Sequence, residues 1–194
     1  MLSAKTPSSA PVALVEGITG EELEFYRASR DHERRVEMEV NLNVNGRNRS
    51  VTCRANATLV DVLREQLNLT GAHVGCDTSQ CGACTVHLNG DAVKACTILA
   101  AQCEGQAVLT IEGLSSADGH HPMQAAFKNC HALQCGFCTP GMIMSAIDLA
   151  QKNDDLTEAQ IREQLEGNLC RCTGYQNIAA AVAEGAAMMK EAGQ

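Results

Sequence analysis

The 194-residue sequence predicts an α+β protein in which a small β-sheet domain precedes an all-α domain. Residues 36–44 alternate apolar and polar side chains, and a period of two is typical of a half-buried strand. Beyond residue 121 the apolar side chains recur with the 3.6-residue period of helices. Eight of the eleven cysteines form two groups, one in each region. We therefore expect two small domains, each organised around a group of thiols.

Composition and charge narrow the class of protein. The net charge is -8 at pH 7, so acidic residues outnumber basic ones and we expect no nucleic-acid partner. The sequence has no apolar run long enough for a transmembrane helix and no signal-peptide pattern, so we expect a cytoplasmic protein. Cysteines at this density in a cytoplasmic protein usually bind metal. With no Trp, two Tyr and three Phe, the core must be small and aliphatic, so we expect metal ligation to help stabilise the fold.

Residues 1–35 are expected to form an N-terminal extension. Residues 1–17 are rich in Ser, Ala and Pro without a sustained period, which is typical of a flexible or partner-ordered arm. Thr19-Gly-Glu-Glu22 then has the pattern of a capping box and predicts a short charged helix to about residue 34. That helix is either a frayed leader or docks on a partner through three apolar residues: Leu23, Phe25 and Tyr26.

The first domain, residues 36–113, is expected to begin with a hairpin and a helix. Asn45-Gly46 is a hairpin-turn signal after the strand at 36–44, and a return strand is expected at about 50–54. Thr58 is expected to cap a helix, because the apolar residues that follow it are spaced to form one helical face. A long loop at residues 71–84 comes next.

A second hairpin and a last strand complete this domain. The hairpin turns at Asn89-Gly90 and returns to Cys96, and the segment 107–112 has the pattern of a strand. These pieces predict a small mixed sheet. Strand, turn, strand, helix, loop and hairpin is the element order of a β-grasp ferredoxin.

The loop carries the first cysteine group, Cys76-Asp-Thr-Ser-Gln-Cys81-Gly-Ala-Cys84, with Cys96 as its fourth member. The C-x4-C-x2-C spacing with a distant fourth cysteine matches plant-type [2Fe-2S] ferredoxins. Two irons bridged by two sulfides need four converging thiolates, and a curled loop supplies three of them. Gly75 and Gly82 suit such a loop because glycine adopts positive φ at little cost. The alternative is a zinc site, although zinc ligands usually come as two separated pairs.

The second domain, residues 122–194, follows a linker at 114–121 and is expected to contain four helices. Their predicted ranges are about 122–130, 140–151, 157–165 and 176–190. Thr157-Glu-Ala-Gln160 has the pattern of a capping box for the third helix.

The second cysteine group is split between two helix starts. Cys135 and Cys138 precede the second helix, whereas Cys170 and Cys172 precede the fourth. Helix N-termini carry partial positive charge, which favours an anionic metal cluster at this place. Spacing alone also permits a tetrahedral zinc ion.

These motifs resemble a known family. Cys135-Gly-Phe-Cys138-Thr-Pro-Gly and Gly-Asn-Leu-Cys170-Arg-Cys172-Thr-Gly are similar to the helical [2Fe-2S] domain of the molybdenum hydroxylases, the xanthine oxidase family. Together with the first cysteine loop, the resemblance covers about residues 37–190. It is strongest to the small subunit of aerobic carbon monoxide dehydrogenases and of related bacterial aldehyde or heterocycle hydroxylases.

The resemblance implies an electron relay between partner subunits. A large subunit would hold molybdopterin and a medium subunit FAD, in a dimer of heterotrimers. Electrons would pass from molybdenum to a proximal cluster, then to a distal cluster, then to the flavin. The implied ligands are Cys135, Cys138, Cys170 and Cys172 for the proximal cluster and Cys76, Cys81, Cys84 and Cys96 for the distal one. Gln134 and Cys172 would contact the molybdopterin.

Some questions stay open at this level. Carbon monoxide, an aldehyde, a purine or another N-heterocycle all fit as the partner's substrate. A free-standing two-cluster ferredoxin serving several reductases is the alternative function, and a zinc-stabilised interaction module is a third. Cys53, Cys103 and Cys130 are left over and are expected to be packed as small apolar side chains.

Overall fold

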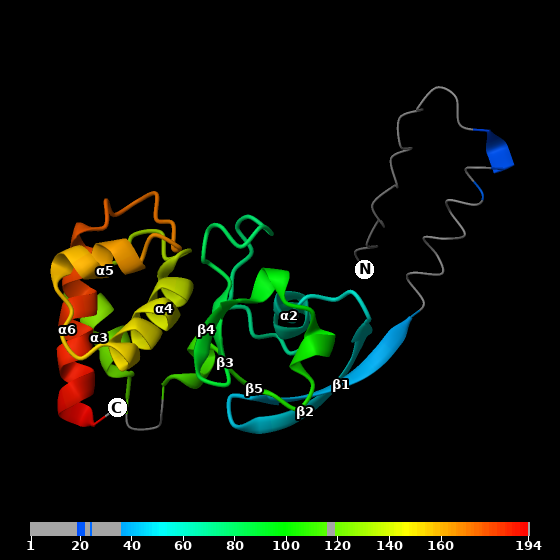
Figure 1. Ribbon diagram of the computed structural model, residues 1–194, viewed down its shortest axis with the longest axis horizontal. Helices are drawn as coiled ribbons and strands as arrows, with labels where there is room; N and C mark the ends of the chain where they lie inside the picture. Colours follow the sequence, from blue (N-terminus) through cyan, green and yellow to red (C-terminus); the bar gives the residue numbers. More distant parts are fainter. Residues whose placement is uncertain (1–18, 22–23, 25–35, 116–118, 194) are drawn as a thin grey trace, which may run out of the picture. The chain divides into compact units, whose positions relative to one another are not determined.

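The computed structural model describes residues 19–21, 24, 36–115 and 119–193 (Figure 1). The predicted arm at 1–17 lies outside these ranges, as do most of the predicted helix that follows it and part of the predicted linker. Residues Glu37–Gln194 form one compact unit. No helix among the described residues is long and apolar enough to cross a membrane.

The predicted hairpin is confirmed and begins the sheet. Strands β1 (Glu37–Val44) and β2 (Arg47–Arg54) pair antiparallel, with Val40 opposite Val51. Asn45 and Gly46 both have positive φ, 52° and 76°, as a tight two-residue turn requires. Because this turn lets the strands pair immediately, β2 begins at Arg47 and is longer than the sequence predicted.

The sheet is mixed and has the order β2-β1-β5-β3-β4. Strands β3 (Thr85–Leu88) and β4 (Asp91–Lys94) form the second predicted hairpin. Strand β5 (Ala107–Leu109) lies parallel to β1 and antiparallel to β3. The strand predicted at 107–112 ends early because η4 (Ile111–Gly113) is a 3-10 helix.

The predicted helix after Thr58 is present in two parts. It starts as α2 (Leu59–Asp61) and continues as a π-helical segment, η1 (Val62–Gln66). Thr58 caps it as predicted: the Thr58 hydroxyl accepts from Asp61 N at 3.3 Å, and the Asp61 carboxylate accepts from Thr58 N at 3.1 Å.

A first core lies between this helix and the sheet. Its residues come from the strands, the helix and two short 3-10 helices, η2 (Ala95–Thr97) and η3 (Ala100–Cys103). Cys53 and Cys103 belong to it and are 3% and 0% exposed, so the prediction that they pack as apolar side chains is confirmed.

The four predicted helices of the second domain are confirmed. They are α3 (Pro122–Asn129), α4 (Thr139–Lys152), α5 (Glu158–Gln164) and α6 (Gln176–Ala192). Thr157 caps α5 through a capping box with Gln160, as its sequence predicted. A second core fills the space between the helices, and its largest fully buried side chains are Met123, Phe127, Met142, Ile161, Ile178 and Met189.

Helix α4 joins the two domains, and Figure 1 shows it beside β3 and β4. The imidazole Nε2 of His87, a buried residue of β3, lies 2.8 Å from the carbonyl oxygen of Met144. At the N-terminal end of α4, a Cβ added to Gly141 would collide with the carbonyl oxygen of Gly82 in the first cysteine loop. The start of α4 is therefore packed directly against that loop.

Candidate iron–sulfur sites

The first cysteine loop wraps its backbone around Cys76. The N–H groups of Cys81 and Thr78 donate to the Cys76 sulfur at 3.3 and 3.4 Å. Left-handed φ angles at Asp77 and Ser79, 58° and 63°, turn the chain so that both N–H groups point inward. The hydrogen bond from Cys81, followed by that from Thr78, lowers the pKa of Cys76 to about 6. The loop is thus shaped to hold a thiolate, which is the form of cysteine that binds metal.

The two glycines of this loop have different roles. Gly82 has φ +71°, as predicted, and a Cβ there would lie 2.6 Å from the Asn168 side-chain nitrogen. Gly75 does not have positive φ, so that part of the prediction is wrong. Instead, a Cβ on Gly75 would lie 3.0 Å from the Cys81 sulfur, so a larger residue there would push on this thiol.

The second hairpin returns Cys96 to Cys84, as the sequence predicted. Cys96 lies in η2, and the N–H of Ala95 donates to the carbonyl oxygen of Cys84 at 3.3 Å. Burial, with the neighbouring Cys96 thiol, raises the pKa of Cys84 to about 11. Burial also raises the pKa of Cys81, and a hydrogen bond with the Cys76 thiol acts in the same direction. The first group therefore consists of two neighbouring thiol pairs, Cys76 with Cys81 and Cys84 with Cys96.

The second cysteine group also consists of two pairs. Cys135 and Cys172 place their sulfur atoms 3.5 Å apart, and both residues are exposed. Cys138, the N-cap of α4, faces the thiol of the buried Cys170, and burial raises the pKa of Cys138 to about 12. The predicted position of the C-x2-C pair at the start of α4 is confirmed.

Tyr175 shapes the turn that carries Cys170 and Cys172. It has a left-handed φ of 66° and precedes α6. Its hydroxyl accepts from Cys170 N at 2.7 Å. Burial acts to raise the pKa of Cys170, but hydrogen bonds from Thr173 and from the backbone N–H of Cys172 outweigh it and lower the pKa. Neither the φ angle of Tyr175 nor its hydroxyl contact follows from the spacing of the cysteines, so its role could not be predicted from the sequence.

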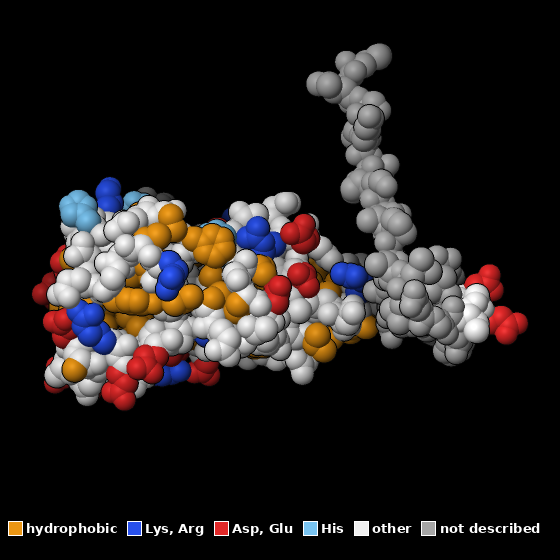
Figure 2. All heavy atoms as spheres, turned by 90° about the horizontal axis from the view of Figure 1, so that it is seen from above, with side chains coloured by type: hydrophobic (Ala, Val, Ile, Leu, Met, Phe, Trp, Pro, Cys, Tyr) orange, Lys and Arg blue, Asp and Glu red, His pale blue; other side chains and the backbone are white. Residues whose placement is uncertain are grey.

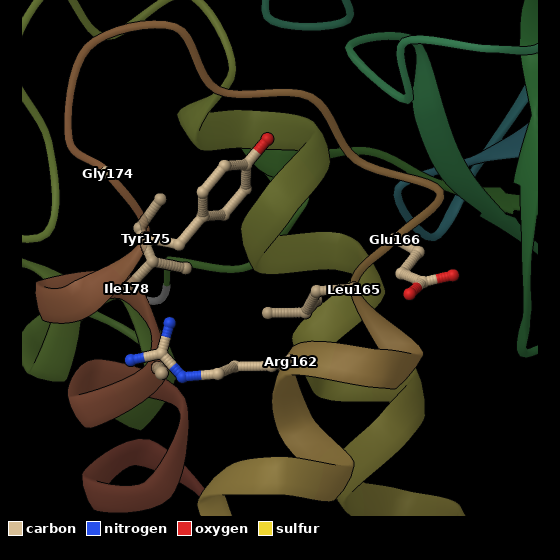
Figure 3. A pocket seen from close by; sticks show the side chains of 7 residues that line it. Arg162, Leu165, Glu166, Gly174, Tyr175 and Ile178 are labelled. Atoms are coloured by element: carbon tan, nitrogen blue, oxygen red, sulfur yellow. The ribbon is translucent and has the colours of Figure 1, made fainter.

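A cavity of about 370 Å³ lies beside this turn. Figure 3 shows the Tyr175 hydroxyl and the Arg162 guanidinium pointing in different directions from its wall. Arg162 is already bonded to Glu158 and Gln176, and the rest of the lining is mainly apolar. The lining residues offer no nucleophile and base in contact, so the cavity has no evident catalytic chemistry.

Exposed apolar side chains flank both cysteine groups: Val74, Leu133, Phe137 and Leu169. Phe137 is 47% exposed, and its ring stacks on His73 with centroids 4.6 Å apart. His73 Nδ1 also lies 2.7 Å from the Phe137 carbonyl oxygen, so His73 holds Phe137 in place through both its ring and its hydrogen bond. In the view of Figure 2, apolar side chains gather over the half of the molecule that carries the helical domain. Leu169 links the two groups, because its N–H donates to the carbonyl oxygen of Cys81 at 2.8 Å.

The geometry of the thiols tests which metal they suit. A [2Fe-2S] cluster takes two thiolates on each of two irons. Two pairs in each group fit the cluster.

Two protein families match successive parts of the chain. Residues 42–110 match the family described as a 2Fe-2S iron-sulfur cluster binding domain, and residues 110–183 match a [2Fe-2S] binding domain. The nicotine 6-hydroxylase small subunit of Paenarthrobacter nicotinovorans is 51% identical over 146 residues, covering 75% of this chain and 87% of that protein. The chain belongs to the small iron–sulfur subunits of the molybdenum hydroxylases. The predicted family is thus confirmed.

Other relatives agree with this assignment of the iron–sulfur subunit. The aldehyde oxidoreductase iron-sulfur-binding subunit PaoA of Escherichia coli K12 is 42% identical over 168 residues, covering 79% of this chain and 73% of that subunit. The solved quinoline 2-oxidoreductase of Pseudomonas putida 86 superposes with a TM-score of 0.78 at 38% identity, covering 81% of this chain and 98% of that chain. The β-grasp and helical [2Fe-2S] domains are therefore confirmed, and the subunit belongs to an oxidoreductase complex.

The structure also places the residues that the resemblance singled out. All eight predicted ligands lie in the two groups, and Gln134 is exposed beside Cys135. Cys130 is separate from both groups: it packs against the second core, with its sulfur 3.1 Å from a Glu184 carboxylate oxygen.

Proposed function

We propose that this subunit carries electrons one at a time through two [2Fe-2S] clusters, from a molybdopterin-binding subunit to an FAD-binding subunit. The observation that supports the proposal is the arrangement of eight thiols as two groups of two pairs, in a chain of this family. The proposed ligands are Cys76, Cys81, Cys84 and Cys96 in the β-grasp domain and Cys135, Cys138, Cys170 and Cys172 in the helical domain.

The thiol pairs assign ligands to individual irons. Cys76 and Cys81 would hold one iron of the β-grasp cluster, and Cys84 and Cys96 the other. In the helical domain the pairs would be Cys135 with Cys172 and Cys138 with Cys170. Each cluster, when bound, supplies a site that accepts and releases one electron. The protein's own contribution is to hold the thiolates, as the two N–H donors to Cys76 do.

Exposure supports the direction of the relay. In the helical group Cys135 and Cys172 are exposed, as is Gln134, whereas the β-grasp thiols are half-buried or buried. A cofactor on a partner can therefore reach the helical-domain thiols directly, which is what contact between Gln134, Cys172 and molybdopterin requires. We assign the helical-domain cluster as proximal and the β-grasp cluster as distal.

Exposed apolar side chains favour a fixed complex over a free-standing ferredoxin. Phe137 and Leu169 are 47% and 53% exposed and lie next to the cysteine groups, where a large partner would cover them. The proposed partners are a large molybdopterin subunit, which would hold the substrate site, and a medium FAD subunit, in a dimer of heterotrimers. All eleven cysteines are free of disulfides, which supports a reducing cytoplasmic compartment.

The decisive experiment is to purify the chain together with the products of its neighbouring genes. We expect molybdenum and flavin to co-purify, about four iron atoms per chain and two distinct cluster signals in electron paramagnetic resonance. Two irons per chain, or one kind of signal, would contradict the two-cluster proposal. A stable monomer with both clusters and no molybdenum-containing partner would favour the ferredoxin alternative, and a colourless zinc protein would exclude both.

A further inference from the structure

Lys94, the last residue of β4, reaches from the β-grasp domain into the helical domain. Its Nζ donates to Thr85 Oγ1 at 3.2 Å, to the Gly167 carbonyl oxygen at 2.9 Å and to Asn168 Oδ1 at 3.3 Å. An ammonium group has three N–H donors, and each of them has an acceptor here. Gly167 and Asn168 lie just before Cys170, so Lys94 ties the β-grasp sheet to the second cysteine turn.

The charge of Lys94 is directed at thiols. Its three acceptors are neutral oxygens, and among the described residues no carboxylate forms an ion pair with it. Lys94 pairs in the sheet with Thr85, the residue after Cys84, and it lies two residues before Cys96. The proposed β-grasp ligands therefore flank Lys94 in its own pair of strands, and a bound cluster with its four thiolates would carry net negative charge that grows by one unit on reduction.

Asn168 completes the junction between the two cysteine loops. It is 4% exposed, its Nδ2 donates to the Gly82 carbonyl oxygen at 3.2 Å, and its Oδ1 also accepts from Ser145 Oγ at 2.9 Å. The next residue, Leu169, donates its N–H to the Cys81 carbonyl oxygen. One hydrogen bond thus joins the backbone of one proposed ligand to the residue that precedes another, Cys170.

We propose that Lys94 raises the reduction potential of the β-grasp cluster relative to the helical-domain cluster, and that its junction with Asn168 fixes the two cysteine loops against each other. The inference rests on the proposed function. A positive charge beside a cluster stabilises the electron that the cluster accepts, so the potential rises. Electrons that enter at the helical domain are then drawn toward the β-grasp cluster. Lys94 acts through charge and position and is not a ligand.

Lys152 provides a matched control at the same interface. Its Nζ lies 2.9 Å from Asp91 and 2.7 Å from Asp148, so it is a lysine that also links the hairpin to α4. Unlike Lys94, it is exposed and paired with two carboxylates. Removing Lys152 changes the charge of the interface but does not change the surroundings of the thiols.

The test is a redox titration of the full chain in the complex in which it is purified, with each cluster followed by its own paramagnetic signal. In Lys94→Gln, we expect the potential of the β-grasp cluster to fall relative to that of the other. The electron-sharing equilibrium should shift about tenfold toward the helical-domain cluster, which equals 59 mV for a one-electron couple. Lys94→Arg should restore most of the difference, and Lys152→Gln should leave it unchanged.

Two results would overturn the inference. The first is that neither potential changes in Lys94→Gln. The second is that both potentials shift by the same amount, as general loosening of the fold would cause. Iron is counted in the same samples, so a chain with fewer than four irons fails the proposed function, whereas a fully loaded chain with an unchanged difference fails only this inference.

A measurement on the unmodified chain covers the case in which Lys94→Gln does not assemble. The Leu169 amide is bonded to the Cys81 carbonyl oxygen, so we expect it to exchange with solvent deuterium much more slowly than the unbonded amides of exposed loops. Exchange as fast as in those loops would show that the junction does not hold the two loops together.

Discussion

Gly82→Ala tests whether the two cysteine loops are locked together. Gly82 is buried, has φ +71° and faces the helical domain. A Cβ there would lie 2.6 Å from the Asn168 side-chain nitrogen and closer still to the Gly167 carbonyl oxygen. The Gly167 backbone is held by Lys94 and has no simple way to move aside.

The expected cost has two parts. A left-handed conformation costs an L-residue about 1–2 kcal/mol. Forcing a methyl group into a closely packed contact costs roughly a further 1–3 kcal/mol. Gly90→Ala is the matched control, because Gly90 has φ +98° in the second hairpin but no atom within 4 Å of its would-be Cβ. Gly90→Ala therefore has the same cost for the left-handed conformation and the same change in unfolded-state entropy, but it does not have the cost of the crowded methyl group.

The assay is thermal unfolding of the iron-loaded chain, followed by circular dichroism and by loss of cluster absorbance. A difference of about 2 kcal/mol between the variants corresponds to roughly 4–8 °C in midpoint for a chain of this size. We expect Gly82→Ala to melt lower than Gly90→Ala by that amount and to lose its clusters sooner. Equal midpoints would refute the claim that the loop is packed against the helical domain.

Three further predictions concern the ligands, an ion pair and a helix cap. Cys172→Ser should abolish or alter the helical-domain cluster signal and leave the β-grasp signal intact in electron paramagnetic resonance; equal loss of both would contradict the ligand assignment. The hydrogen bond from Lys152 lowers the pKa of Asp91, so this pair stabilises the fold at neutral pH, and its contribution should disappear as the pH falls below about 4. Acid titrations of Lys152→Gln and the unmodified chain should therefore converge at low pH, and a constant gap would argue against the pair. Thr157→Ala removes the acceptor for Gln160 N and should cost about 1 kcal/mol in urea unfolding, whereas Thr157→Ser keeps the hydroxyl acceptor and should cost less.

The sequence by itself determined the features that depend on neighbouring residues. Alternation in 36–44 predicted β1, the capping patterns at Thr58 and Thr157 predicted two helix starts, and the change of period after residue 121 predicted the helical domain. The cysteine spacing predicted both groups, because three ligands on one curled loop must be close in sequence. These signals are local, so they survive without knowledge of the fold.

Boundaries and backbone angles were less predictable. The strand expected at 107–112 stops at Leu109, and most of the helix after Thr58 is π-helical, because packing against the sheet decides where each element ends. Gly75 was expected to have positive φ, but its place depends on the Cys81 sulfur beside it. Tyr175 adopts a left-handed angle that its residue type does not predict.

Only the tertiary structure decided how the two cysteine groups are connected. Lys94 and Gly167 are 73 residues apart, and nothing in the pattern around either of them indicates that they meet. The same is true of Asn168 and Gly82, which are 86 residues apart. Periodicity, caps and ligand spacing record which element a residue belongs to. Contacts between distant loops arise only when α4 packs on β3 and β4, so the junction that would set the relay's geometry and its relative potentials is a property of the folded chain.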